Sequence, residues 1–163
     1  MTEKYKRYEE LSPDELYQIK ELIIKGGEVN VETLSSRLEE VELIGYAEND
    51  NQIVATASIK NPLNSYVVKV FLKAGNKCDP KNFKYELGYV MVNEKFRKDK
   101  LASKLCYHLC ETFNLTNIFA TTKIENMGML SILEKNSFKK VGQPYLNNDK
   151  SAHLQLLIKQ ITQ

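Results

Sequence analysis

The chain has 163 residues, 42% of them hydrophobic and 27% charged, a composition typical of one globular domain with a buried core. Its net charge of +2 is too small to indicate nucleic acid or an anionic membrane as a partner. There is no apolar run near the roughly 18 residues of a membrane span, and no apolar signal-peptide segment. With 3 cysteines, a small and odd number, we expect a reduced, cytoplasmic protein.

Two helices followed by two strands are predicted first along the chain. Ser12-Pro13-Asp14-Glu15 is typical of a helix start, with a capping serine, a proline at the first helical position and a glutamate that reaches back. Gly26-Gly27 ends that helix, because glycine tolerates the left-handed conformation found there. A shorter helix is expected from Asn30, and strands over 41–48 and 52–60 flank a polar turn.

The middle of the chain alternates strand and helix patterns. Residues 65–74 fit a buried strand or a helix, and we favour a helix because Ser65 can cap it and Gly75 can end it. A loop over 75–82 follows. The remaining elements are strands at 85–92, 117–122, 138–141 and 152–158, and helices at 99–113 and from Asn126. This order predicts α/β layers.

The segment after the strand at 85–92 is suited to an anion. A basic turn containing Arg97, Lys98 and Lys100 opens the amphipathic helix at 99–113. The first backbone N–H groups of a helix have no partner inside it, and the helix dipole adds positive potential there. The segment therefore predicts a site for an anion such as a pyrophosphate.

Two motifs resemble the GNAT superfamily of N-acetyltransferases. The turn Arg97-Lys98-Asp99-Lys100-Leu101-Ala102 is similar to the family pattern Arg/Gln-x-x-Gly-x-Gly/Ala, with Lys100 replacing the first glycine. Residues 126–138 are similar to the family element Asn-x-x-Ala-x-x-x-Tyr-x-x-x-Gly-Phe. Asn126 and Phe138 match that element, whereas Leu133 stands at the tyrosine and Ser137 at the glycine.

The resemblance implies a fold and a reaction. The fold is an α/β (α+β) domain over residues 1–163, with a mixed, mostly antiparallel sheet flanked by helices and a V-shaped splay between the central strands. The reaction is direct attack of a primary amine, on a small molecule or peptide, on acetyl-CoA, without a metal. A homodimer is also compatible with the resemblance. The alternative is a non-catalytic acyl-CoA-binding or protein-interaction member of the same fold.

The resemblance also assigns the acetyl-CoA contacts. Backbone groups of a strand ending in a bulge would bind the pantetheine arm, the turn would hold the pyrophosphate, and the next helix would contribute one side chain. The implied contacts to the pantetheine arm are Val90, Met91 and Val92. The implied contacts to the pyrophosphate are Arg97, Lys98, Asp99, Lys100, Leu101, Ala102 and Ser103, and the side chain from the next helix is that of Asn126. Lys100 either adds a phosphate-binding ammonium or points outward, and Asp99 repels phosphate.

Glu86 is the candidate general base, because it lies on the central strand where many family members carry an acidic residue. The alternative is a structural glutamate paired with a lysine. Leu133 cannot protonate the leaving thiolate, so the thiolate leaves unassisted, takes a proton from water, or takes one from a substitute side chain. The substitutes are Tyr145, which we take as the second catalytic candidate, Tyr89 and His153. For these three, a half-buried aromatic with one polar contact is the other interpretation.

Residues 61–84 lie outside both motifs and, with the first two helices and the last hairpin, are expected to shape the acceptor site. The side chains offered there are Tyr17, Lys60, Asn61, Tyr66, Tyr145 and Asn147. These side chains include no clear charge, opposite to that of an acceptor, that would identify the acceptor. Cys106 and Cys110 are interpreted as buried small residues rather than zinc ligands, because the intervening His108 points elsewhere.

Overall fold

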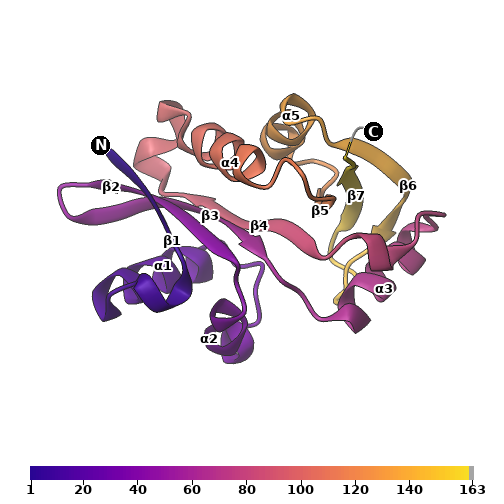
Figure 1. Cartoon of the computed structure of the whole chain (residues 1–163), viewed down its shortest axis with the longest axis horizontal. Coiled ribbons are helices and arrows are strands. Elements are labelled where there is room, and N and C mark those ends of the chain that lie inside the picture. The colour runs from indigo at the N-terminus through magenta and orange to yellow at the C-terminus, as the bar shows by residue number, and fades with distance from the viewer. Residues whose placement is uncertain (162–163) are drawn as a thin grey trace. The chain divides into compact units, whose positions relative to one another are not determined.

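The computed structural model describes residues 1–161, drawn in Figure 1 from indigo at the N-terminus to yellow at the C-terminus. The chain divides into two compact units. The first contains residues 1–61 and 87–112, and the second contains residues 62–86 and the chain from residue 113 onward.

The first unit contains three antiparallel strands, β1 (Thr2–Lys6), β2 (Leu43–Asn49) and β3 (Gln52–Lys60), and two helices, α1 (Pro13–Lys25) and α2 (Val31–Glu39). The predicted start of α1 is confirmed: Glu15 N donates to Ser12 Oγ at 3.1 Å, and Ser12 N donates to Glu15 Oε2 at 2.9 Å. Strand β1 and the 3₁₀ turn Tyr8–Glu10 were not predicted. β1 alternates mostly polar side chains, so it lacks the apolar pattern that marks a strand.

Strand β2 has two different faces. Ile44 and Tyr46 are fully buried in a core shared with Ile19 of α1 and Leu34 of α2. Gly45 faces the other way, where an added Cβ would meet Leu105 at 3.5 Å. Helix α4 (Leu101–Thr112) therefore covers the opposite face of these strands from α1 and α2, as Figure 1 shows.

Helix α4 follows the predicted apolar stripe, with Leu101, Leu105 and Leu109 buried. Cys106 and Cys110 are also fully buried, and the ring of His108 stacks on Tyr5 with a centroid distance of 3.8 Å. The helix begins two residues later than predicted, because Glu94–Asp99 form a 3₁₀ turn before it.

The second unit contains α3 (Asn64–Ala74), the 3₁₀ turn Pro80–Asn82, β5 (Ile118–Lys123), α5 (Met127–Lys135), β6 (Lys139–Leu146) and β7 (His153–Lys159). Residues 65–74 are helical as favoured, and Gly75 ends the helix at φ +65°. Strand β6 continues past the predicted end at residue 141, through a register shift that begins after Val141 and contains Gly142 at φ +67°.

Aromatic rings form much of the core of the second unit. Phe71 of α3 packs against Phe83 and Phe119, with centroid distances of 5.2 and 5.6 Å. Helix α3 also approaches β6 closely: a Cβ at Gly142 would lie 2.2 Å from the carbonyl oxygen of Ala74. Only glycine fits at that contact, so α3 is held tightly against β6.

One strand, β4 (Tyr85–Val92), passes from the second unit into the first after residue 86. It pairs in parallel with β5, joining Tyr85 to Ile118 and Glu86 to Phe119, a short pairing that fits the implied splay. The hydrogen-bonded order is β1-β2-β3-β4-β5-β7-β6, with antiparallel pairs in the majority. The predicted fold class, a mixed and mostly antiparallel sheet flanked by helices, is confirmed.

Within residues 1–161, no helix combines the length and apolar character that crossing a bilayer requires. The same residues contain no cluster of three or more His, Cys, Asp or Glu side chains placed to hold a metal ion.

Candidate active site

The turn between β4 and α4 is fixed by Asn93. Its backbone N–H donates to Val54 O at 2.8 Å, and its side-chain oxygen accepts from Lys95 N at 3.1 Å. The first helical hydrogen bond of α4 runs from Lys104 N to Lys100 O at 3.1 Å. The amides of Leu101 to Ser103 therefore stand at the helix start, where the helix offers them no carbonyl partner.

Lys100 adopts the conformation of the glycine that it replaces. Its φ is +57° and its ψ is +27°, in the left-handed region that glycine occupies readily and other residues rarely. The conformation costs a non-glycine residue about 1 kcal/mol. The turn therefore has a glycine-like backbone at the position where the family pattern has glycine, and it carries a lysine side chain there.

The side chains around this turn are exposed and mostly basic. Arg97, Lys98 and Lys100 are all exposed, and Arg97 forms a 3.7 Å ion pair with Glu94. Both partners are more than half exposed, so this pair contributes little to stability. Asp99 is exposed as well and opposes an anion. The donor set fits a pyrophosphate: helix-start amides lie beside Arg97, Lys98 and Lys100, and the carboxylates of Glu94 and Asp99 oppose an anion there.

Within β4, Tyr89 has a φ of +51°. A left-handed residue interrupts the pleat of a strand, so the regular alternation of faces does not continue past Tyr89 into Val90 and Val92. Lys60 of β3 lies over the Tyr89 ring, 4.4 Å from its centroid, and its Cδ would be 2.7 Å from a Cβ at Gly88. The irregularity comes directly before the backbone assigned to the pantetheine arm.

In the second unit, Glu86 lies in a buried cluster of hydroxyl groups. Glu86 is 4% exposed, and Tyr66 Oη of α3 donates a hydrogen bond to Glu86 Oε1 at 3.2 Å. Tyr145 Oη of β6 is buried and makes no hydrogen bond within residues 1–161. The structure thus brings together the two predicted catalytic candidates and a third residue, Tyr66, that was expected only at the acceptor site.

Both tyrosines of the cluster stay protonated at neutral pH. Burial raises the pKa of Tyr66 far above its usual value, and the negative charge of Glu86 raises it further, against a lowering hydrogen bond from Thr121. Burial also raises the pKa of Tyr145, and Glu86 adds to that rise. Each phenol is therefore a neutral hydrogen-bond donor.

The second motif keeps its backbone although two of its side chains differ. Asn126 caps α5, because its side-chain oxygen accepts from Met129 N at 3.0 Å. Ser137, at the glycine position, has a φ of +69°, and Phe138 N donates to Leu133 O at 3.0 Å to close the helix end. Leu133 is fully buried, so it packs the core where the family tyrosine would stand.

The structure gives the remaining candidates other surroundings. His153 is exposed at the start of β7, and Tyr89 belongs to the first unit. Asn147 stabilises the turn in which it lies, because its side-chain oxygen accepts a hydrogen bond from Ser151 N at 2.9 Å. The link from Tyr66 to Glu86 was missed because a contact between a helix and a strand 20 residues apart leaves no periodic signal.

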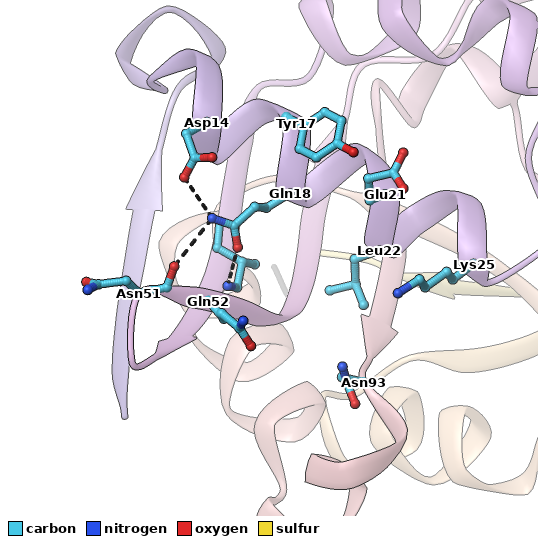
Figure 2. Close-up of a pocket in the computed structure, with 10 residues that line it drawn as sticks. Asp14, Tyr17, Gln18, Glu21, Leu22, Lys25, Asn51, Gln52 and Asn93 are labelled. Carbon is cyan, nitrogen blue, oxygen red and sulfur yellow. Dashed lines mark hydrogen bonds between the residues drawn. The ribbon is translucent and has the colours of Figure 1, made fainter.

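The first unit also has an open polar pocket of about 530 Å³, shown in Figure 2. It is lined by Asp14, Tyr17, Gln18, Glu21, Leu22, Lys25, Asn51, Gln52, Ile53 and Asn93. Gln18 spans it, donating to Asp14 Oδ2 at 2.8 Å and accepting from Ile53 N at 2.8 Å. The bond from Ile53 N ties α1 to β3, whereas the bond to Asp14 stays within α1, so Gln18 has a structural role.

The acetyltransferase (GNAT) family pattern matches residues 3–138, and the chain belongs to this family. No protein of curated function matches the chain in sequence.

Solved structures agree with the fold. Escherichia coli ElaA superposes with a TM-score of 0.72 at 15% identity, covering 98% of this chain and 100% of that one. The ribosomal-protein-S18-alanine N-acetyltransferase of Escherichia coli gives 0.69 at 12% identity, covering 99% and 96%. Ribosomal-protein-alanine N-acetyltransferase of Brucella melitensis gives 0.70 at 15% identity, covering 99% and 100%. At such identities, the likeness concerns the fold alone.

Proposed function

We propose that this protein transfers the acetyl group of acetyl-CoA to a primary amine by direct attack, without an acyl-enzyme. The observation that carries the proposal is the buried Glu86 on β4, the strand that continues into the backbone assigned to acetyl-CoA. Acetyl-CoA would supply the acetyl group as a thioester. Much of the acceleration in such a reaction comes from holding the two reactants together.

Glu86 acts as the general base in this proposal. The amine must lose a proton as its nitrogen forms a bond to the acetyl carbon, and the carboxylate takes that proton directly or through one water. Burial keeps bulk water from Glu86, and Tyr66 donates a hydrogen bond to its carboxylate. The bond from carbon to sulfur then breaks, and its electron pair leaves with the thiolate.

Tyr145 is the proposed proton donor to that thiolate. Its hydroxyl is buried, stays protonated, and makes no hydrogen bond to any described residue. A buried donor of this kind is stabilised by gaining an acceptor. Leu133 leaves the family tyrosine position without a proton, so another donor or solvent must supply it.

The pyrophosphate is proposed to bind at the start of α4, on the amides from Lys98 to Ser103, with Arg97 beside them. The left-handed Lys100 supports this assignment, because the turn retains the glycine-type backbone that the family pattern requires. Val90, Met91 and Val92 are proposed to bind the pantetheine arm through their backbone, and Asn126 to approach it from α5.

The acceptor is proposed to be an amine on a small molecule or a peptide. The two alanine N-acetyltransferases among the similar structures make a peptide N-terminus a reasonable first acceptor to test.

The direct test mixes the protein with acetyl-CoA and a panel of amines, including amino acids, polyamines and peptides with different N-termini, and follows thiol release. Release that depends on both the protein and one class of amine is expected. Binding of CoA without release for any amine would instead support a non-catalytic acyl-CoA-binding member, which the buried Leu133 favours. Absence of CoA binding would contradict both the acetyltransferase activity and the non-catalytic acyl-CoA-binding alternative.

A further inference from the structure

We propose that Tyr66 of helix α3 is a positioning residue that orients the Glu86 carboxylate for proton transfer. The inference rests on the proposed function of Glu86 and assigns a task to the 61–84 segment, which lies outside both family motifs. It is carried by the placement of a phenol hydroxyl 3.2 Å from Glu86 Oε1 inside a buried cluster.

The Tyr66 ring cannot swing away easily, because its helix is fixed. Val67, Val70 and Phe71 of α3 are buried in the core of the second unit. The close approach of Gly142 to Ala74 holds the end of the helix against β6, and Lys73 Nζ reaches Asn148 Oδ1 in the β6–β7 turn at 3.2 Å. Helix α3 therefore presents its side chains from a rigid support.

The neighbouring strand supports the ring from the other side. Phe119 of β5 is the register partner of Glu86 on β4, and the Tyr66 ring packs on Phe119 with a centroid distance of 6.5 Å. The phenol is thus confined between its own helix and the residue beside the carboxylate that it contacts. This packing limits the positions that the hydroxyl can take, and the hydrogen bond to Glu86 Oε1 gives its direction.

A hydroxyl that donates to Oε1 acts on the carboxylate in two ways. It limits rotation of the carboxyl group, which sets the direction of Oε2, and it stabilises the charged form that accepts a proton. The titratable groups that face Glu86 within the second unit are Tyr66 from α3 and Tyr145 from β6, and Thr121 of β5 adds an uncharged hydroxyl. Of these, Tyr66 makes the direct hydrogen bond.

The test replaces Tyr66 by phenylalanine, which removes one oxygen and keeps the ring. The matched control is Tyr107→Phe, a tyrosine that is 61% exposed on α4. The first measurement follows the Glu86 carboxyl carbon by ¹³C NMR through a pH titration without substrate, with the signal assigned by its loss in Glu86→Gln. Tyr66→Phe removes the hydrogen bond to the carboxylate and is expected to move the pH at which this signal changes upward, and Tyr107→Phe to leave it unchanged.

The second measurement is thiol release across pH. Tyr66→Phe is expected to lower kcat/KM by about tenfold and to move the acid limb of the profile to higher pH, while the KM for acetyl-CoA stays the same. A purely structural role would not move the acid limb. An unchanged midpoint together with an unchanged profile would overturn the inference.

The two proposals fail in different ways. If the wild-type protein releases no thiol, the proposed function falls, while the titration midpoint still decides whether Tyr66 controls Glu86. If Tyr66→Phe does not fold, 3-fluorotyrosine placed at position 66 keeps the hydroxyl and makes it a stronger donor. That substitution is expected to move the Glu86 midpoint downward, and a midpoint that stays in place or rises would contradict the inference.

Discussion

Each of the two units holds a glutamate that accepts a hydrogen bond from a tyrosine, and the two environments differ. In the first unit, Glu15 Oε1 accepts from Tyr46 Oη at 2.7 Å and from Lys6 Nζ at 2.9 Å. Its other oxygen accepts from Ser12 N at the start of α1. Charge, dipole and phenol all hold this carboxylate ionised in one place.

In the second unit, Glu86 is 4% exposed, accepts from Tyr66, and lies near a second phenol at Tyr145. A carboxylate whose acceptor sites are taken by a cation and a helix cap anchors structure. Glu86 instead lies among buried hydroxyl groups, where a neutral phenol is one of its hydrogen-bond partners. We expect the donors around each carboxylate, rather than burial alone, to decide which of the two glutamates takes a proton in the proposed reaction.

Replacing Glu86 gives the largest expected effect. Glu86→Gln keeps the size of the side chain and removes the basic oxygen, so kcat/KM for thiol release should fall by about 100-fold or more. Glu15→Gln, measured beside it as a control, should leave kcat/KM within about twofold because its carboxylate takes no part in transfer. Equal rates of thiol release for Glu86→Gln and the wild-type protein would contradict the proposed difference between Glu86 and Glu15.

Replacing Glu15 should act on stability instead. Glu15→Gln removes the charge that Lys6, Tyr46 and the Ser12 amide share, so the free energy of unfolding should fall by about 1.5–3 kcal/mol in urea denaturation. The partners are left in place, which adds the cost of unpaired polar groups. No loss of stability would show that Glu15 does not anchor the first unit.

The pH dependence of stability follows from the same carboxylate. Burial alone would raise the pKa of Glu15, but the hydrogen bonds from Tyr46, Ser12 and Lys6 outweigh it and lower the pKa from 4.5 to about 2. A carboxyl whose pKa is lower in the folded state stabilises the protein above its unfolded pKa. That stability is lost as the pH falls from about 4.5 towards 2. Urea midpoints over this range should drop more steeply for the wild-type protein than for Glu15→Gln.

A smaller effect is expected at Lys100, where backbone and charge act in opposite directions. Lys100→Gly relieves a left-handed lysine and should raise the free energy of unfolding by up to about 1 kcal/mol. It also removes an ammonium from the anion site, so affinity for acetyl-CoA should fall several-fold in calorimetry. Lys100→Asn, which tolerates the same φ without the charge, should lose the same affinity. Unchanged or tighter binding of acetyl-CoA by both variants would contradict a role for Lys100 in phosphate binding.

Ser137 gives the smallest expected effect and a test of backbone alone. Ser137→Gly should raise the free energy of unfolding by about 0.5 kcal/mol, because the residue sits at φ +69° after α5. The control is Ser131→Gly, an exposed position inside α5, which should lower stability by a similar amount. Thermal unfolding of the two variants should therefore move in opposite directions.

Much of the fold was predictable from the sequence because caps and periodicity are local signals. Ser12 with Glu15, and Gly75 after α3, mark helix ends by side chains that act within a turn. Strand β1 was missed because its partners in β2 lie 38 to 46 positions further along the chain. The extension of β6 was missed because Gly142 and Pro144 look like a stop, whereas the structure absorbs them in a register shift.

The site was predictable only in part. The motifs pointed to the turn and to Glu86, and Lys100 and Ser137, which stand at glycine positions of the motifs, both have a left-handed φ. The position of Tyr66 beside Glu86 depends on how α3 packs, which no spacing in the sequence reports.

The central claim, that acetyl-CoA binds along β4 and the start of α4, is tested most directly by mapping backbone amide shifts of ¹⁵N-labelled protein as acetyl-CoA is added. The largest changes are expected at Val90–Val92 and from Lys98 to Ser103. Changes concentrated instead around Tyr17 and Lys25, in the open pocket of the first unit, would contradict the claim, as would no change at all.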